Sequence, residues 1–168
     1  NLAMGLFLMG SYIVTLPLLI RQNHEGTSSE LAWMNIANAV GLFLSSMTLL
    51  RIGGVKRPGR ALLVSLAVAG FLLGCAAFAR SFAELIFIVF LWGASGGFVM
   101  IMSRSIMQEQ APAEQRARIM AFFSLSFMGA GLVGSLLNGY LVEIFRAEGA
   151  LLFAASGITL AVVLIGMI

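Results

Sequence analysis

Six long runs of apolar residues dominate the sequence, and none of them contains a Lys, Arg, Asp, Glu or His residue. Crossing the hydrocarbon core of a bilayer, which is about 30 Å thick, takes about 20 helical residues, and each run has about that length. Lipid offers the backbone no hydrogen-bond partners, so each run must form a helix, and the alternation typical of barrel strands is absent. The sequence therefore predicts one all-α membrane bundle over residues 1–168, with transmembrane helices at about 2–20, 31–50, 61–79, 85–102, 119–142 and 150–168.

The scarcity of charge excludes a water-soluble globule. Only 10% of the residues are charged and 60% are hydrophobic, whereas about a quarter of the residues in a soluble domain are charged. The net charge of +3 comes from short turns and not from a basic surface interleaved with aromatic residues. We therefore expect a lipid bilayer, and not nucleic acid, as the partner. We expect no metal or cofactor, and the single cysteine, Cys75, has no second cysteine for a disulfide.

The turns between the runs alternate in their content of basic residues. The turns after the second and fourth runs hold seven Lys and Arg residues, and the opposite turns hold three. Basic residues in short loops stay in the cytoplasm because their translocation is costly. We therefore expect residues 1 and 168 near the cytoplasmic side of the membrane, with the turns at 21–30, 80–84 and 143–149 facing outward. The seven basic residues are Arg51, Lys56, Arg57, Arg60, Arg104, Arg116 and Arg118.

Three local patterns predict how the helices begin and bend. Ser81 and Glu84 have the spacing of a capping box at the start of the fourth run. Pro112 suits the first turn of the fifth helix, where the negative charge of Glu114 is also favourable. Pro17 predicts a kink near the outer end of the first helix.

Small residues recur four positions apart in three of the runs. Helices in lipid associate through close packing, which small residues permit, so these stripes predict helix contact faces. The same smooth faces would also let helices slide past one another, and the spacing fits both interpretations. The positions are Gly70 and Gly74, Gly93 and Gly97, and Gly131, Ser135 and Gly139.

Uncharged polar side chains within the runs are few, and Tyr12, Asn35, Asn38 and Asn138 are the main ones. Polar groups at membrane depth face the bundle interior or a water-filled cavity. These side chains either form hydrogen bonds between helices or line a substrate path, and the sequence fits both roles. Trp92 is either an interface or a cavity aromatic. No charged residue lies deep in a run, which argues against a proton relay or an ion-coordinating acid within these spans.

An enzymatic interpretation fails for lack of a base. Residues 93–96 read Gly-Ala-Ser-Gly, which resembles the nucleophile segment of rhomboid intramembrane proteases. A serine is a weak nucleophile without an adjacent base, and the only histidine, His24, lies in a polar turn outside the runs. We therefore expect no enzymatic activity.

The first basic turn carries a family pattern. The stretch GGVKRPGRALL resembles the cytoplasmic loop of the major facilitator superfamily, which reads approximately G-x-x-x-D-R-x-G-R-R. Arg57, Gly59 and Arg60 match its R-x-G-R part. Lys56 stands in place of the aspartate and Gly53 is displaced by one position, which suits the degenerate copy in the second half of such transporters.

The second basic turn is similar to another loop of the same superfamily. The stretch QEQAPAEQRARIMAFFS resembles the turn between the tenth and eleventh helices, where a proline, an acid and an R-G-R pair precede a helix. Pro112, Glu114, Arg116 and Arg118 match this pattern, with Ala117 in place of the glycine. The glycine-rich stretch GAGLVGSLLNGYL that follows also resembles the next helix of the family.

The resemblance implies the C-terminal, six-helix half of a twelve-helix transporter. Such a half consists of two inverted three-helix repeats, and substrate binds near the midplane between the two halves. The partner would then be an N-terminal half that is missing here, which agrees with a chain that starts at Asn1 and enters a span at once. The sequence also resembles bacterial exporters such as the macrolide-efflux and siderophore-export branch, which implies a bacterial inner membrane.

Two functions follow as hypotheses. The resemblance implies export of small amphipathic or drug-like molecules by alternating access, without cofactors, and cavity walls from the first, second, fourth and fifth helices. The alternative is a six-helix membrane protein with a structural or assembly role and no transport. The candidates for the substrate path are Tyr12, Asn35, Asn38 and Asn138. The residues of the basic turns either anchor the topology or also make loop contacts that stabilise one transport state. The candidates for these contacts are Arg57, Gly59, Arg60, Arg104, Glu114 and Arg116.

Overall fold

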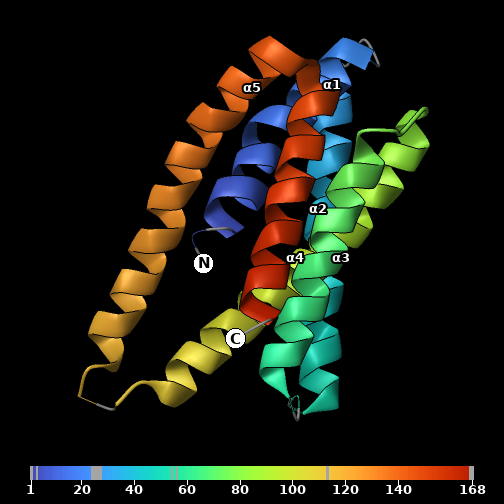
Figure 1. Ribbon diagram of the computed structural model, residues 1–168. Coiled ribbons are helices and arrows are strands. Elements are labelled where there is room, and N and C mark those ends of the chain that lie inside the picture. The colour runs from blue at the N-terminus through green and yellow to red at the C-terminus, as the bar shows by residue number, and fades with distance from the viewer. Residues whose placement is uncertain are drawn as a thin grey trace.

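The computed structural model describes residues 2, 4–23, 28–53, 55, 57–112 and 114–166. Within these ranges the chain is helical and has no strand. The helices pack lengthwise as a bundle (Figure 1). In chain order they are η1 (Met4–Met9), η2 (Ser11–Thr15), α1 (Leu16–Asn23), α2 (Ser28–Ile52), α3 (Pro58–Ala76), α4 (Phe82–Gln110) and α5 (Arg116–Gly166).

Five segments of the described chain are long and apolar enough to cross a membrane, whereas the sequence predicted six. The five are Met4–Arg21, Ser28–Ile52, Pro58–Ala76, Phe82–Gln110 and Arg116–Leu164.

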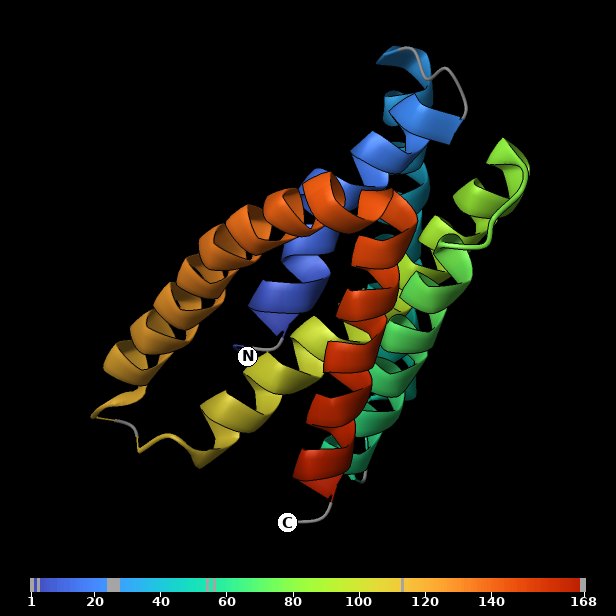
Figure 2. The same ribbon diagram turned by 45° about the horizontal axis from the view of Figure 1, so that its top comes forward.

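The difference arises in α5, which runs through the turn expected at residues 143–149. Only Arg146 leaves the helical conformation there, with φ 61° and ψ 175°. The range 143–149 contains no proline, and its one glycine, Gly149, lies three residues after the break and is itself helical. The connection is therefore a one-residue break. At this break α5 reverses direction, and its two arms run in opposite directions (Figures 1 and 2).

The first span is not a regular α-helix. η1 and η2 are π-helical, and the N–H of Leu16 donates to the carbonyl oxygen of Ser11, five residues back. Pro17 lies directly after the change from π- to α-helical bonding and has no N–H to donate at this junction. π-helical turns are rare and occur frequently at functional sites.

The predicted capping box at the start of α4 is confirmed. The N–H of Glu84 donates to Ser81 Oγ at 3.2 Å, and the N–H of Ser81 donates to Glu84 Oε2 at 3.3 Å. At α5 the prediction was wrong, because Pro112 lies before the helix. The N–H of Gln115 donates to the Pro112 carbonyl oxygen at 3.0 Å and closes a separate turn there.

Loss of this cap should lower the stability of the fold by a small, measurable amount. We expect Ser81→Ala to cost about 1 kcal/mol, because the Glu84 N–H loses its acceptor. The measurement is the unfolding midpoint of the purified protein in detergent. Ser105→Ala is the matched control, since that exposed hydroxyl donates only to the Glu109 side chain; an equal loss in both variants would contradict the capping role.

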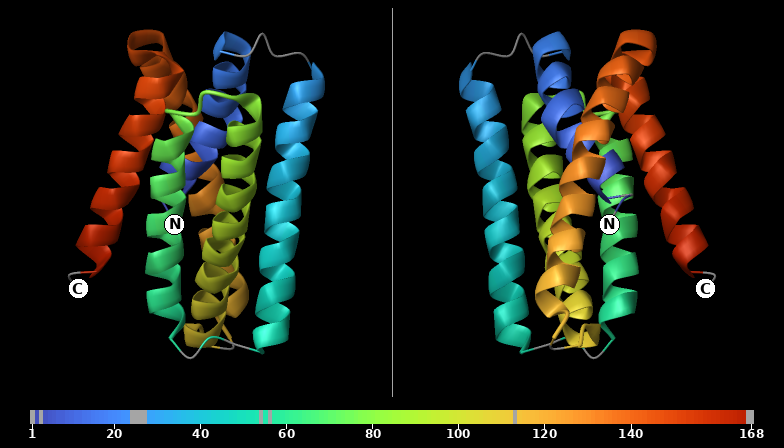
Figure 3. Two further views of the ribbon diagram at one scale, coloured as in Figure 1. Left: turned by 90° about the vertical axis from the view of Figure 1, so that its right-hand side faces the viewer. Right: turned by 90° about the vertical axis from the view of Figure 1, so that its left-hand side faces the viewer.

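Both basic turns lie at the same end of the bundle. The α2–α3 and α4–α5 connections are at one end, and the α3–α4 connection and the break at Arg146 are at the other (Figures 1 and 3). This arrangement fits the alternation from which the topology was predicted. Residues 1 and 168, His24 and Lys56, for which a position was also expected, lie outside the described residues.

α4 packs between α2 and α3, and the first span packs against α5. The α2–α4 contact is close because glycines remove side chains from it. A Cβ atom added at Gly93 would lie 2.5 Å from the carbonyl oxygen and 3.0 Å from the Cα of Asn38, and one at Gly97 would clash with Ser45 Oγ. Backbones can approach this closely only where a small residue stands.

The other positions of the small-residue stripes differ in their surroundings. An added Cβ at Gly70 would lie 2.9 Å from the Ile158 side chain on the second arm of α5, and one at Gly131 would clash with Met9 of η1. Gly74 has only an ordinary contact, with Ala155 at 3.7 Å. Gly139 faces open space, and Ser135 donates to the Gly131 carbonyl oxygen of its own helix at 2.8 Å.

Candidate functional site

A groove of about 250 Å³ opens among the first span, α2, α4 and α5. These are the four segments from which cavity walls were expected. No charged side chain lines the groove. We call it the Tyr12–Trp92 groove, and its lining includes Tyr12, Asn38, Trp92, Gly96, Met100 and Phe127.

Two aromatic rings stack at one wall of the groove. The ring centroids of Tyr12 and Trp92 are 5.5 Å apart, with an interplanar angle of 21°. Tyr12 Oη donates to Asn35 Oδ1 at 2.6 Å, and Asn35 Nδ2 donates to the Leu31 carbonyl oxygen at 2.8 Å. Asn35 therefore holds the Tyr12 ring over the indole from outside the groove.

The Trp92 indole carries a polar group without a partner. Trp92 is 8% exposed, and its Nε1 is buried without a hydrogen-bond acceptor in the part of the chain that the structure describes. A buried tryptophan N–H usually finds an acceptor, and leaving a donor unsatisfied costs about 1–3 kcal/mol. The sequence left open whether Trp92 is an interface or a cavity aromatic. The signal for a buried position was its place directly before Gly93, in the close α2–α4 contact.

Asn138 has a different role from the other polar candidates. It is 1% exposed, and its Oδ1 accepts from Ser11 Oγ at 3.3 Å and from Thr15 Oγ1 at 3.1 Å. Its Nδ2 donates to the carbonyl oxygens of Gly134 at 2.8 Å and Leu6 at 3.4 Å. This uses both donors and both acceptor positions of the amide, so the side chain ties the first span to α5 and presents no free group to a ligand.

Removing this tie should destabilise the bundle. We expect Asn138→Leu to lower the free energy of unfolding by about 1.5 kcal/mol, because the hydroxyls of Ser11 and Thr15 lose their buried acceptor. The measurement is the unfolding midpoint in detergent. Ser135→Ala on the same helix should stay close to the wild type, and a stable Asn138→Leu variant with impaired transport would instead place Asn138 on the substrate path.

The structure thus separates the four polar candidates. Tyr12 and Asn38 line the groove, and Asn38, 8% exposed, is buried at the contact with Gly93. Asn35 is exposed and supports Tyr12. Asn138 lies apart from the groove lining in a satisfied cluster.

The loop candidates on the first basic turn are exposed. Arg57 directly precedes α3, Arg60 lies in its first turn, and a Cβ added at Gly59 would meet nothing within 4 Å. The turn itself begins where Gly53 ends α2 with φ 69°, and the Gly53 N–H donates to the Leu49 carbonyl oxygen at 3.2 Å. This positive φ suits glycine.

The loop candidates on the second basic turn are exposed as well. Arg104, Glu114 and Arg116 all reach solvent, and none of them forms an ion pair in the described part of the chain. Glu109, near the end of α4, accepts from Ser105 Oγ at 3.0 Å. Among the described residues these arginines therefore form no ion pair with Glu109 or Glu114.

A larger cavity, of about 640 Å³, lies between α3 and the second arm of α5. Its polar side chains are used, because Ser156 donates to the Phe153 carbonyl oxygen at 2.7 Å and Thr159 to that of Ala155 at 2.8 Å. It offers a ligand no free polar group comparable to the Trp92 N–H, so the smaller groove is the better candidate site. Nowhere in the described ranges do three His, Cys, Asp or Glu residues gather as a metal site would require.

The comparison with known families decides what kind of protein this bundle is. A family model described as Major Facilitator Superfamily matches residues 2–168, which is nearly the whole chain. The chain belongs to the Major Facilitator Superfamily. No curated protein and no solved structure matches it.

Membership in the Major Facilitator Superfamily, together with the long apolar helices, indicates an integral membrane protein and points to a transporter rather than an enzyme. Ser95, the residue of the protease-like segment, is buried and donates to the Trp92 carbonyl oxygen at 2.9 Å. A transporter recognises its substrate noncovalently in a cavity, and the Tyr12–Trp92 groove is the candidate for that cavity in this chain.

Proposed function

We propose that the chain is the C-terminal half of a twelve-helix secondary transporter that exports small, uncharged or weakly charged amphipathic molecules. In this proposal the half consists of two inverted three-helix repeats, each arm of α5 crosses the membrane, and the basic turns face the cytoplasm of a bacterial cell. The match of both basic turns to loops of the superfamily, and their common end of the bundle, support this orientation.

The observation that carries the proposal is the unpaired Trp92 N–H beside the stacked Tyr12 ring in an uncharged groove. An apolar cavity with a few directed polar groups is the usual form of a small-molecule site. A flat apolar substrate with an acceptor oxygen would stack against the aromatic rings and receive the indole hydrogen bond. Movement of the Tyr12 ring away from the indole would give the substrate access.

Alternating access then follows from rocking of this bundle against an N-terminal half. In this proposal the exposed loop residues make contacts in the opposite transport state; in the described part of the chain they form no ion pair. Double substitution of Arg57 and Arg60 by alanine tests this role, and normal transport by a normally inserted variant would leave them as topological anchors. The proposed loop residues are Arg57, Gly59, Arg60, Arg104, Glu114 and Arg116.

The test of the function is a resistance and efflux screen of the full-length gene in a host that lacks its own pumps. We expect the wild type to lower the accumulation of at least one fluorescent amphipathic dye. Tyr12→Ala should abolish this effect at unchanged protein level, because the groove loses its stacking ring. Tyr140→Ala, at an exposed tyrosine of α5, should keep it.

Two outcomes would contradict the proposal. A panel of dyes and drugs without any difference between wild type and empty vector would favour the structural or assembly role. Equal losses in the Tyr12 and Tyr140 variants would show that the groove has no special part in transport.

A further inference from the structure

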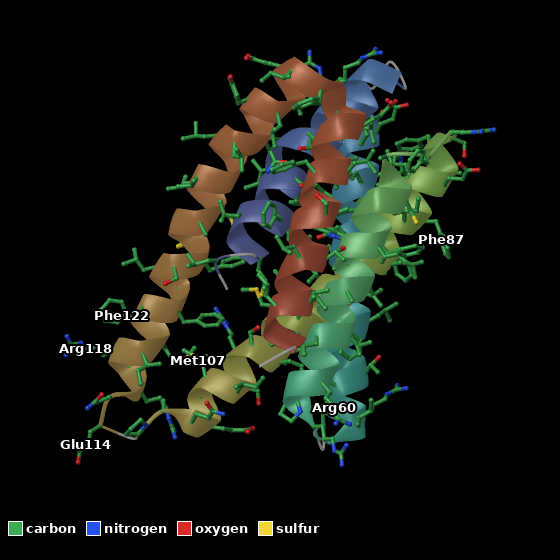
Figure 4. All side chains as sticks on the ribbon, in the orientation of Figure 1. Arg60, Phe87, Met107, Glu114, Arg118 and Phe122 are labelled. Carbon is green, nitrogen blue, oxygen red and sulfur yellow. The ribbon has the colours of Figure 1, made fainter. Side chains whose placement is uncertain are left out.

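The turn between α2 and α3 carries several positive charges that no acidic side chain balances in the described part of the chain. Arg51, Arg57 and Arg60 are exposed, and none has an ion pair in the described part of the chain. Residues 51–60 contain no acidic residue. Glu114, which lies at the same end of the bundle, is on the other side of it from Arg60 (Figure 4). Orientation in the membrane explains basic residues here, but not the cavity beside them.

An apolar groove begins directly at Arg60. A cavity of about 350 Å³ is lined by Leu49, Ile52 and Val55 together with Arg60, Val64 and Phe98. A second cavity, of about 280 Å³, shares Val64, Ser65 and Phe98 with the first and continues to Leu72, Leu91 and Ala94. Because the two cavities share three lining residues, they form one groove along α3 and α4, with α2 lining only the end at Arg60. We call it the α3 groove.

The depth of the α3 groove is close to that of one lipid leaflet. Arg60, Val64, Val68 and Leu72 follow one another four positions apart and so lie on one face of α3. From Arg60 to Leu72 the helix rises about 18 Å, and half of the bilayer hydrocarbon core is about 15 Å. The charged end of the groove is therefore at the membrane surface when its apolar end is near the midplane.

Ser65 adds a polar group at an intermediate depth. Its side chain is half-buried, lines both cavities, and has no hydrogen bond in the described part of the chain. It lies about 7 Å below Arg60 along the helix axis. A phospholipid carries its polar groups in the same order, with the phosphate outermost, the ester oxygens below it and the acyl chains beneath.

We propose that the α3 groove binds one anionic phospholipid. Arg60 and Arg57 hold the phosphate, the Ser65 hydroxyl donates to an ester oxygen, and an acyl chain lies along Val64, Val68 and Leu72. The charge selects an anionic headgroup, since basic residues at a membrane surface attract anionic lipids. This inference does not depend on the transported substrate, because the groove lies on a different face of α4 from the Tyr12–Trp92 groove and shares no lining residue with it.

The experiment measures lipid retention by the purified full-length protein. Phosphatidylglycerol and phosphatidylcholine of the same chain length are added to the delipidated protein in detergent, and bound lipid is counted by native mass spectrometry. We expect one phosphatidylglycerol to be retained, with about tenfold lower retention of phosphatidylcholine. An arginine near an anionic headgroup contributes about a fivefold effect, so Arg57→Gln with Arg60→Gln should remove most of the preference.

Two further variants test the groove itself. Val64→Trp fills it and should abolish retention of both lipids, whereas Leu132→Trp, at an exposed position of α5, should leave retention unchanged. Arg118→Gln removes a charge from the other basic turn and should keep the preference. Monodisperse elution of each variant shows that it is folded.

Three outcomes would overturn the proposal. The first is equal retention of the two lipids by the wild type. The second is an equal loss of preference in Arg118→Gln and in the double arginine variant. The third is full competition by inorganic phosphate at the lipid concentration, which would make the site one for a free anion and not for a lipid.

Discussion

Replacing Gly93 by leucine should strongly destabilise the folded bundle. The position faces the backbone of Asn38, and an added Cβ alone would lie 2.5 Å from its carbonyl oxygen. A backbone cannot yield as a flexible side chain does, so α2 and α4 would have to separate along their contact. Overpacking a helix contact costs about 1–3 kcal/mol, and we expect about 3 kcal/mol here, measured as loss of the monodisperse peak and of the unfolding midpoint in detergent.

Gly96 supplies the matched control for this prediction. It lies on the same helix, one turn away, and a Cβ added there would meet nothing within 4 Å. It also lines the Tyr12–Trp92 groove. Gly96→Leu should therefore fold as well as the wild type but lose transport, because its side chain enters the groove. Equal folding of the two variants would show that α2 and α4 do not approach as the structure has them.

The difference between Gly93 and Gly96 shows which features of the fold the sequence predicts and which it does not. The apolar runs predicted the helices because bilayer thickness fixes their length, and the capping box at Ser81 and Glu84 was readable because it uses only local residues. The stripes of small residues indicated faces, but not which member touches a neighbour. Gly93 faces a neighbouring backbone and Gly139 faces open space, although both belong to stripes with the same spacing. Which glycine is in contact depends on where the next helix lies.

The polar residues show the same limit. Tyr12 and Asn138 read alike in the sequence, as isolated polar groups within apolar runs. In the fold, the first span lies against α5, so Asn138 Oδ1 accepts hydrogen bonds from Ser11 and Thr15. The side-chain amide of Asn138 has no hydrogen-bonding position left for a ligand. The chain reversal between the fifth and sixth runs was expected at residues 143–149, but its form as a one-residue break at Arg146 was not, since nothing local distinguishes a loop from such a break.

Replacing Trp92 by phenylalanine should raise the KM for the transported substrate about thirtyfold while leaving the fold intact. A donated hydrogen bond in a buried site is worth about 2 kcal/mol, which corresponds to that factor. Phenylalanine keeps a ring against Tyr12 and removes only the N–H and part of the indole. Because the N–H is unpaired in this state, its removal breaks no bond within the protein, and the unfolding midpoint should change little.

A substrate analogue separates the hydrogen bond from the shape of the side chain. An analogue that lacks the acceptor oxygen should be transported poorly by the wild type and equally poorly by Trp92→Phe, because the two changes remove the same interaction. Trp33→Phe, at a tryptophan of α2 that is 59% exposed, should behave as the wild type with both compounds. If Trp92→Phe instead lowers transport of both compounds by the same factor, the indole acts by filling space, and the N–H has no part in recognition. The double comparison therefore decides whether the unsatisfied Trp92 N–H is the group by which this transporter selects its substrate.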